Sequence, residues 1–438
     1  MPVERVGNTV RVHPVGAVAG TVRLPGSKSL TNRYLTCTAL ADGESTLRGA
    51  SLSSDTLRMV AGLQCLGVQV EVREEGPAIR VQGCRGHLPA DDAELDAGDA
   101  GTAMRFLTAL ACLGYGRFRL DGSVRMRARP IGQLVDGLHA IGAGIGYEGV
   151  EGYPPLTIVA RGLAGGEIEF DRPPSSQYIS AILMVSPYAA ADVMIRVNGP
   201  LVSRPYVDMT IAVMRSLAVE VLSAEGRRFI VPNAQRYRAG EVNIEPDASA
   251  ASYFWAAAAV TGGRVRVRDL TRASFQGDVR FVDVLERMGC RVNAGDDYIE
   301  VQGPPVGALQ RLDVDLNEMP DVVQTLAVVA LFAKGVTRIR NVANLRIKET
   351  DRLAALGTEL TKLGGAVEVS DDGLAVTPPA RVTPATINTY NDHRMAMSFA
   401  LAGLAVDGIV IKDADCVSKS FPDYFDALAG LGVSPKGS

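Results

Sequence analysis

Cysteine is scarce in this chain, and its six copies are scattered along it. None forms a Cys-x-x-Cys pair, and few of the four histidines lie near a cysteine. This excludes a disulfide-stapled secreted domain and a zinc site built from cysteines. We therefore expect buried, reduced thiols in a cytoplasmic protein. The cysteines are Cys37, Cys65, Cys84, Cys112, Cys290 and Cys416.

Long apolar runs and an excess of one charge are also lacking. No segment approaches the roughly 20 apolar residues that span a membrane, and the first residues, Met-Pro-Val-Glu-Arg, have no signal-peptide core. The formal net charge of the 438 residues is only −4. Neither nucleic acid nor a membrane is therefore expected as a partner. An anion site would need local clustering of arginine and lysine.

What the chain does have is a sixfold repeat. An apolar-periodic helix that ends near Leu-Gly or a similar pair, followed by a β-branched stretch, recurs along the sequence. The second residues of these pairs stand at positions 67, 142, 218, 289, 364 and 432, a spacing too long for a solenoid. Each repeat is predicted to be a small subdomain of strands and helices. Three repeats in each half predict an α/β (α+β) protein of two similar domains, with a boundary near 244–246.

The segment 24–33, Leu-Pro-Gly-Ser-Lys-Ser-Leu-Thr-Asn-Arg, predicts an anion site. It follows a predicted strand and opens a helix, so that Lys28, Ser29 and Arg33 lie at the start of that helix. Free N–H groups and the positive end of the helix dipole attract phosphate or carboxylate there. The alternative is a Ser-capped surface helix with a solvated lysine and arginine. A Walker P-loop fits poorly, because a serine separates the glycine from the lysine.

Other helix starts in the first half are also polar or cationic. The turn 98–105 consists of small residues that allow a ligand to approach the backbone, and it does not match a dinucleotide fingerprint. A loop with three arginines follows, which needs either an anion or water. Ser-Ser-Gln and Ser-Arg-Pro-Tyr open two further helices. The candidate residues are Gly101, Arg125, Arg127, Arg129, Ser175, Ser176, Gln177, Ser203 and Tyr206.

The second half has the same arrangement. Asp321 opens one apolar helix, the segment 391–394 (Asn-Asp-His-Arg) opens another, and 344–352 is the densest charged cluster of the chain. If the helix starts of both halves face one cleft, their dipoles and cations would converge on a pair of anionic substrates. The candidate residues are Asp321, Asn344, Arg346, Lys348, Glu349, Asp351, Arg352, His393, Arg394 and Lys419.

At this point the chain resembles a known family. Leu-Pro-Gly-Ser-Lys-Ser-x-x-Asn-Arg, Ala-Gly-Thr-Ala-Met-Arg, Lys-Glu-Thr-Asp-Arg and Tyr-Asn-Asp-His-Arg-Met-Ala-Met are similar to motifs of the 5-enolpyruvylshikimate-3-phosphate synthases, of the glyphosate-sensitive class. The resemblance covers about 15–431. It implies an inside-out α/β barrel of two domains, each of three βαβαββ repeats. One domain would be 26–244 and the other 1–25 with 245–438, and the active-site cleft would lie between them.

The resemblance also implies the reaction and its site. The enolpyruvyl group of phosphoenolpyruvate would pass to the 5-hydroxyl of shikimate 3-phosphate, with release of phosphate, in a monomer without metal or organic cofactor. By matched motif, shikimate 3-phosphate would be held by Lys28, Ser29, Arg33, Ser175, Ser176, Ser203, Tyr206, Asp321, Asn344 and Lys348. Phosphoenolpyruvate would be surrounded by Lys28, Gly101, Arg129, Gln177, Arg352, Arg394 and Lys419.

The reaction needs one proton delivered to the methylene carbon and one removed from the hydroxyl. Lys28, Asp321, Glu349 and His393 are the candidate catalytic residues, and the sequence does not assign acid and base. A carboxylate among several cations should stay ionised. The alternative for Glu349 is an ion pair with Arg352 on the same helix.

Three other functions compete with this one. The nearest is the enolpyruvyl transferase that acts on UDP-N-acetylglucosamine. That family has a reactive cysteine five residues before an Arg-Pro pair, where this chain has Val124. An inactive binding module is the second alternative, which the intact charged motifs disfavour. The third is a phosphate-binding protein of another fold, which the six repeats disfavour.

Two residues depart from the family's pattern. Asp99 stands where the family usually has asparagine, and Phe106 where it has proline. A change in the helix that follows Gly101 should affect a ligand longer than phosphoenolpyruvate most. We therefore expect reduced glyphosate sensitivity with near-normal use of phosphoenolpyruvate.

Overall fold

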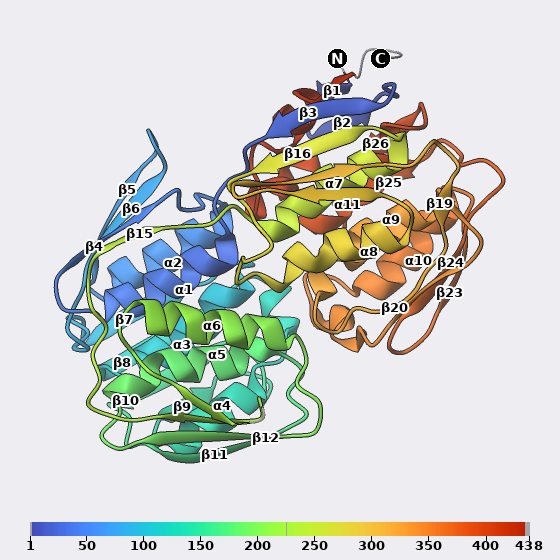
Figure 1. The fold of residues 1–438 in the computed structure, drawn as a ribbon. Helices are drawn as coiled ribbons and strands as arrows, with labels where there is room; N and C mark the ends of the chain where they lie inside the picture. The colour runs from blue at the N-terminus through green and yellow to red at the C-terminus, as the bar shows by residue number, and fades with distance from the viewer. Residues whose placement is uncertain (1, 225, 434–438) are drawn as a thin grey trace. The chain divides into compact units, whose positions relative to one another are not determined.

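The computed structural model describes residues 2–224 and 226–433, and the chain divides into two compact units (Figure 1). The middle unit is Gly26–Glu245. The terminal unit joins the described residues before Gly26 to those after Glu245. The leading strand therefore belongs with the second half of the chain.

The middle unit combines helices with three four-stranded sheets, whose strand orders are β15-β4-β6-β5, β7-β8-β10-β9 and β11-β12-β14-β13. Its helices are α1 (Lys28–Ala39), α2 (Ser54–Cys65), α3 (Gly101–Ala111), α4 (Gly132–Ala140), α5 (Ser176–Val185) and α6 (Arg204–Ser216), with 3-10 turns η1 (Met126–Ala128) and η2 (Ser186–Tyr188). Its strands are β4 (Glu44–Arg48), β5 (Gln69–Arg73), β6 (Ala78–Gln82), β7 (Asp92–Asp96), β8 (Tyr115–Asp121), β9 (Gly144–Tyr147), β10 (Leu156–Arg161), β11 (Gly166–Asp171), β12 (Val193–Asn198), β13 (Leu222–Ala224), β14 (Arg228–Val231) and β15 (Glu241–Asn243).

The terminal unit has the same plan, with sheets in the orders β17-β18-β16-β3-β27, β20-β22-β24-β23 and β1-β2-β26-β25 and a short β19-β21 pair. Its helices are α7 (Ala248–Thr261), α8 (Phe281–Arg287), α9 (Val323–Ala330), α10 (Arg352–Lys362), α11 (His393–Gly403) and α12 (Tyr424–Ala429), with 3-10 turns η3 (Gly277–Arg280), η4 (Pro320–Val322), η5 (Ala343–Ile347) and η6 (Ala414–Lys419). Its strands are β1 (Val3–Val6), β2 (Thr9–Val12), β3 (Val18–Val22), β16 (Arg264–Arg268), β17 (Arg291–Ala294), β18 (Tyr298–Gln302), β19 (Leu309–Gln310), β20 (Asp313–Asp315), β21 (Ala333–Lys334), β22 (Thr337–Arg340), β23 (Ala366–Val369), β24 (Leu374–Thr377), β25 (Thr386–Ile387), β26 (Ile409–Ile411) and β27 (Gly432–Val433).

Each of the six larger sheets contains one parallel pair among antiparallel strands, which confirms the repeat. The parallel pairs are β15/β4, β7/β8, β11/β12, β16/β3, β20/β22 and β25/β26. Two of them join strands from distant repeats. The leading strand β3 pairs with β16, and β15 at the end of the middle unit pairs with β4 near its start. The middle unit is thus closed by its last strand, β15, whereas in the terminal unit the leading strand β3 pairs with both β16 and the last strand β27.

The predicted helix ends are left-handed at five of the six positions. Gly67, Gly142, Gly289 and Gly364 have φ between +84° and +100°, and Ala218 has φ +68°. A residue in this conformation after the last turn ends a helix and turns the chain toward the next strand. Alanine at this position is strained, because its Cβ crowds the neighbouring carbonyl.

Replacing Ala218 with glycine is expected to raise the free energy of unfolding by about 0.5–1 kcal/mol, since relief of the left-handed strain exceeds the added entropy of the unfolded chain. The matched opposite change is Gly67→Ala, whose Cβ would also lie 2.8 Å from Cβ of Pro89. That variant should be less stable than the wild type. Denaturant unfolding of the three proteins decides the matter, and a destabilised Ala218→Gly protein would contradict the expectation.

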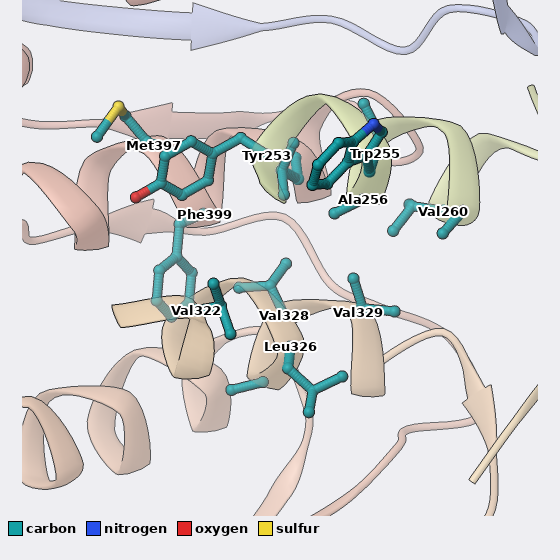
Figure 2. Close-up of a cluster of buried hydrophobic side chains, with 14 of the residues drawn as sticks. Tyr253, Trp255, Ala256, Val260, Val322, Leu326, Val328, Val329, Met397 and Phe399 are labelled. Atoms are coloured by element: carbon teal, nitrogen blue, oxygen red, sulfur yellow. The ribbon is translucent and has the colours of Figure 1, made fainter. Parts of the chain in front are cut away.

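Buried helices form the core of each unit. In the terminal unit, aromatic side chains of α7 and α11, including Tyr253, Trp255 and Phe399, face aliphatic side chains of α9 such as Leu326 and Val328 (Figure 2). α7 and α11 are apolar around most of their circumference because they pack against helices as well as sheets.

Buried hydroxyl groups of these three helices lie close to one another. Ser252 Oγ lies 3.2 Å from Thr325 Oγ1, which lies 3.4 Å from Ser398 Oγ, and each residue is separated from the next by 73 positions. In the middle unit, Asn32 of α1 donates to Thr102 of α3 at 2.8 Å. Ser398 lies at the middle of its helix and the other four residues lie in the first half of theirs, so the starts of α7, α9 and α11 lie near one another, as do those of α1 and α3.

The thiols are less uniformly buried than expected. All six cysteines are free, and Cys37, Cys112 and Cys290 are buried as expected. Cys84 and Cys416 are only half-buried, and Cys65 at the end of α2 is exposed, which corrects the expectation for these three residues. Cys65 faces solvent because it lies on the outer side of an amphipathic helix. In the described part of the chain, no helix is both long and apolar enough to cross a membrane.

Candidate active site

Arg352 is the centre of an ion-pair network in the terminal unit. It is the first residue of α10, and its side chain is 1 % exposed. The guanidinium bonds to Asp392 through Nε at 2.7 Å and Nη2 at 3.2 Å. Nη1 lies 3.2 Å from Oδ1 of Asp321, and Nη2 lies 2.9 Å from Oε2 of Glu349. Burial would lower the pKa of Arg352, but the three carboxylates outweigh burial and raise this pKa.

Asp321, in η4, is surrounded by cations. Besides Arg352, Nη2 of Arg394 donates to its Oδ2 at 2.8 Å, and Nζ of Lys348 lies 4.0 Å from Oδ1. Burial alone would raise the pKa of this carboxyl, but Arg394, Lys348 and Arg352 together hold its pKa well below the usual range. Asp321 is therefore a carboxylate at neutral pH, as the sequence predicts for a carboxyl among cations.

Glu349 forms the ion pair with Arg352 that the sequence raised as an alternative, but not in the predicted way. Asp351 caps α10, accepting a hydrogen bond from the backbone N–H of Ala354, so Glu349 lies before the helix and not on it. This corrects the expectation of a pair within one helix. Lys419 Nζ lies 4.0 Å from Oε1 of Glu349, so the carboxylate is placed between two cations. The ion pair with Arg352 is therefore present, and a role of Glu349 in proton transfer stays a prediction.

The start of α11 brings further predicted residues to this network. Asp392 caps the helix by accepting a hydrogen bond from the backbone N–H of Arg394 at 2.9 Å. Nη1 of Arg394 also donates to Tyr253 Oη at 3.3 Å. His393 is buried, with Nδ1 3.7 Å from Asp392 Oδ1, which is longer than a hydrogen bond. Asn344 is nearly buried in η5.

In the middle unit, Lys28 is the first residue of α1, with Ser27 as its cap. The Nζ of Lys28 forms an ion pair with Oδ2 of Asp55 at 2.8 Å, and the two side chains are only 12 % and 5 % exposed. The pair holds the ammonium in a defined place at the start of α1. The alternative interpretation, in which Lys28 is a solvated surface lysine, is therefore wrong.

Arg33 is a buried cation whose hydrogen-bond partners are hydroxyls and backbone carbonyls, all of them neutral. Its side chain donates to Thr210 Oγ1 at 2.7 Å, Ser29 O at 2.9 Å and Tyr206 O at 3.1 Å. The ring of Phe106 lies 5.5 Å from its guanidinium carbon. Desolvation lowers the pKa of Arg33 to about 10. No carboxylate within the described ranges bonds to this guanidinium, so an anionic ligand would supply the missing charge.

Gly101 and Arg129 are in contact. A Cβ at Gly101, the first residue of α3, would lie 2.8 Å from Nη2 of Arg129, so only glycine leaves room for the guanidinium. Arg105 ties the two segments together, because it donates to Gly101 O at 3.3 Å and to Pro130 O at 2.8 Å. The structure thus brings these two predicted phosphoenolpyruvate residues together.

The remaining predicted residues of this unit lie at two more helix starts. Ser175 caps α5 by accepting from the backbone N–H of Gln177 at 3.3 Å, and Ser176 is nearly buried beside it. Ser203 precedes α6 with φ +56°, and Tyr206 lies in the first turn of that helix. The Tyr206 ring is 5.9 Å from the guanidinium of Arg33, which links the start of α6 to α1.

The two departures from the family's pattern have local partners. Asp99 accepts a hydrogen bond from Ser123 Oγ, in the loop that leads to the three arginines. Phe106 is wholly buried in α3 and packs near Arg33. The expectation of reduced glyphosate sensitivity stays a prediction.

Three residues of the site were not among the sequence candidates. Asp392 had a local signal, since an aspartate directly precedes the helix whose start was predicted, and it is the main partner of Arg352. Asp55 also stands in the first turn of a predicted helix and pairs with Lys28. Tyr253 lies in an alanine-rich apolar helix and carried no such signal.

Together these contacts define a class of protein. Each unit has cations at or near helix starts, and the terminal unit adds carboxylates beside them. Helix starts with cations suit small, multiply charged anions, and carboxylates beside them suit proton transfer to or from such a ligand.

The comparisons identify the family. The model for EPSP synthase (3-phosphoshikimate 1-carboxyvinyltransferase) matches residues 12–428. A 3-phosphoshikimate 1-carboxyvinyltransferase of Shewanella sp. (strain ANA-3) is 49 % identical over 424 residues, covering 96 % of this chain and 99 % of the relative. One from Shewanella oneidensis is 49 % identical over 426 residues, covering 97 % and 99 %. The chain belongs to the EPSP synthase family.

Solved structures agree in fold. An EPSP synthase of Acinetobacter baumannii superposes with a TM-score of 0.80 at 24 % sequence identity, covering 97 % of this chain and 98 % of that one. A second structure of the Acinetobacter baumannii enzyme gives a TM-score of 0.79 at 23 % identity. This likeness confirms the predicted two-domain fold of repeats.

Proposed function

We propose that this chain transfers the enolpyruvyl group of phosphoenolpyruvate to the 5-hydroxyl of shikimate 3-phosphate and releases phosphate. Its family and its relatives support this acceptor over UDP-N-acetylglucosamine. The observation that carries the proposal is the network of Asp321, Arg352 and Arg394, in which an ionised carboxylate lies directly beside two guanidinium groups. It offers a proton acceptor next to a site for phosphate or carboxylate.

Most of the residues proposed to hold shikimate 3-phosphate are in the middle unit. Hydroxyls at the starts of α5 and α6 suit a phosphate, because hydroxyls and free N–H groups meet there. Arg33 suits a second anionic group, since its buried charge lacks a carboxylate partner in the described chain. The full set is Lys28, Ser29, Arg33, Ser175, Ser176, Ser203, Tyr206, Asp321, Asn344 and Lys348.

Phosphoenolpyruvate is proposed to draw on cations of both units. In the terminal unit, Arg352 and Arg394 already bind carboxylates in a geometry that a ligand carboxylate or phosphate can share. The full set is Lys28, Gly101, Arg129, Gln177, Arg352, Arg394 and Lys419.

Asp321 is the proposed proton acceptor for the 5-hydroxyl. In the free protein its cations make it a weak base, because they hold its pKa low. An anionic ligand that engages Arg394 or Arg352 would withdraw part of that stabilisation and raise its basicity. The ammonium of Lys28, His393 and Glu349 are the candidate donors to the methylene carbon, and Glu349, beside two cations, would first have to take up a proton.

The test is phosphate release from phosphoenolpyruvate with each acceptor supplied in turn. We expect turnover with shikimate 3-phosphate and none with UDP-N-acetylglucosamine. Equal turnover with both acceptors, or none with shikimate 3-phosphate, would overturn the proposal.

Replacing Gly101 with alanine is expected to raise the KM for phosphoenolpyruvate about tenfold, because the new methyl group would displace the guanidinium of Arg129. The KM for shikimate 3-phosphate should change little. Gly149→Ala is the matched control, since a Cβ there meets no atom within 4 Å. Equal KM values for phosphoenolpyruvate in both variants would show that the Gly101–Arg129 contact does not serve this ligand.

We also propose a cytoplasmic monomer that binds neither nucleic acid nor membrane. The near-neutral net charge and the six free cysteines support this. Light scattering on the purified protein tests the oligomeric state, and a dimer at micromolar concentration would contradict it.

A further inference from the structure

The turn before α11 is strained. Tyr390 has φ +56° and Asn391 has φ +54°, two successive left-handed residues that are not glycine. Asparagine tolerates this conformation, but tyrosine rarely adopts it. The next residue is Asp392, whose carboxylate binds Arg352 and caps the helix that carries Arg394. A strained turn thus directly determines where two charged residues of the site lie.

A carboxylate on another helix holds this turn. Glu359 of α10 has a side chain with no exposed surface, yet it accepts four hydrogen bonds. Two come from the turn: the backbone N–H of Asn388 at 3.1 Å and the hydroxyl of Tyr390 at 2.7 Å. The other two come from Nζ of Lys362, at 2.8 Å and 2.6 Å. A buried carboxylate is tolerated only when it is bonded in this way, so the turn and the carboxylate depend on each other.

The tyrosine is a permanent donor in this arrangement. Burial, and then the neighbouring Glu359, raise the pKa of Tyr390 to about 12. The hydroxyl therefore keeps its proton at neutral pH and can donate to Glu359.

Side chains of α10 thus bond to the segment 388–394 at two points. Arg352, its first residue, binds Asp392, and Glu359, seven residues later, binds Asn388 and Tyr390. Seven residues are about two helical turns, or roughly 10 Å, so both side chains project from the same face. Two anchors on a rigid helix fix the position and the direction of the turn.

We propose that Glu359 is a positioning residue which, through Asn388 and Tyr390, holds Asp392 and Arg394 in place for phosphoenolpyruvate. The proposal rests on the assignment of Arg394 and Arg352 to phosphoenolpyruvate under the proposed function. Neither Glu359 nor Tyr390 is expected to touch a substrate.

Tyr390→Phe removes one hydroxyl from a half-exposed side chain and leaves the backbone bond of Asn388 in place. Glu359→Gln keeps the shape but removes the charge that both turn groups bond to. We expect the KM for phosphoenolpyruvate to rise about threefold to tenfold in Tyr390→Phe and more in Glu359→Gln, because bonds to a charged acceptor are lost. The KM for shikimate 3-phosphate should stay within about twofold.

Thr361→Val is the matched control, because Thr361 lies on the same helix and its hydroxyl donates to Gly357 O within α10, not to Glu359. Its KM for phosphoenolpyruvate should match that of the wild type. Thermal unfolding of all variants separates positioning from stability. Should Glu359→Gln fail to fold, Tyr390→Phe alone decides the matter.

A Tyr390→Phe enzyme with the wild-type KM for phosphoenolpyruvate overturns the proposal, as do equal increases in both KM values or the same increase in Thr361→Val. Wild-type turnover is measured in the same assay. An inactive wild type would instead refute the proposed function, so the two failures are distinguishable.

Discussion

Asparagine in place of Asp321 is expected to lower kcat by about 10²–10⁴-fold, the usual contribution of a positioned proton acceptor. The amide keeps the size of the carboxylate but cannot take a proton. It also removes the negative charge that Arg394 and Arg352 share. Because Arg352 keeps Asp392 and Glu349 as partners, the fold should survive. Steady-state phosphate release, with thermal unfolding as a check on folding, measures both effects.

The control for this variant is Asp313→Asn. Asp313 bonds to Arg340 at 2.7 Å on the same unit, but both side chains are more than half exposed. A surface pair of this kind contributes little, so kcat should stay within about twofold. If Asp321→Asn retained more than a tenth of the wild-type kcat, Asp321 would not be the proton acceptor.

The lowered pKa of Asp321 also sets a pH dependence. A depressed pKa means that the carboxylate stays ionised as the pH falls through the range around 4, where an ordinary aspartate would take up a proton. The acid limb of kcat/KM should therefore not come from this group, and Asp321→Asn should leave the position of that limb unchanged. A limb that moves in the variant would show that Asp321 titrates in the free enzyme.

Much of the fold could be predicted from the sequence because its signals are local. A serine or aspartate before an apolar-periodic run marks a helix start, and Ser27, Asp247 and Asp392 all cap the helices that follow them. The Leu-Gly and similar ends recur at an even spacing, and five of the six residues that end them are left-handed, Ala218 among them. The number of repeats follows from such signals without any knowledge of packing.

Partners within the site could not be predicted in this way. Arg352 bonds to Asp392, 40 positions away, and to Asp321, 31 positions away. Both carboxylates were visible as charged residues at helix starts, but only the packing of α9, α10 and α11 selects which carboxylate meets which guanidinium. Glu349 was expected on the helix of Arg352 because their spacing allows it, whereas the cap at Asp351 begins the helix later.

Arg33→Met is expected to weaken the binding of shikimate 3-phosphate while leaving the stability of the fold almost unchanged. Arg33 is 1 % exposed, and its bonds go to hydroxyls and backbone carbonyls, while desolvation lowers its pKa to about 10. Burying this cation therefore costs free energy that no carboxylate in the described chain offsets. Methionine is flexible and fills much of the same space without a charge. The melting temperature should consequently stay within a few degrees of the wild-type value.

The affinity for shikimate 3-phosphate, unlike the melting temperature, should change strongly in this variant. If Arg33 supplies the charge that an anionic group of shikimate 3-phosphate meets in a desolvated pocket, Arg33→Met should weaken binding at least about 100-fold. Titration calorimetry measures the affinity directly. Shikimate 3-phosphate should also raise the melting temperature of the wild type but not of the variant, because only a bound ligand stabilises the folded state.

Arg236→Met is the matched control for this experiment. Arg236 lies in the same unit, its guanidinium carbon is 5.0 Å from the ring centre of Tyr188, and its bonds also go to backbone carbonyls, but it is exposed and far along the chain from any helix start. Its removal should leave the affinity for shikimate 3-phosphate unchanged. Equal affinities of the Arg33→Met and wild-type proteins would mean that the buried charge serves another purpose. A large fall in the melting temperature of Arg33→Met would mean that the hydrogen bonds of Arg33 to Thr210 and Tyr206 stabilise the fold by more than the desolvation of its charge destabilises it.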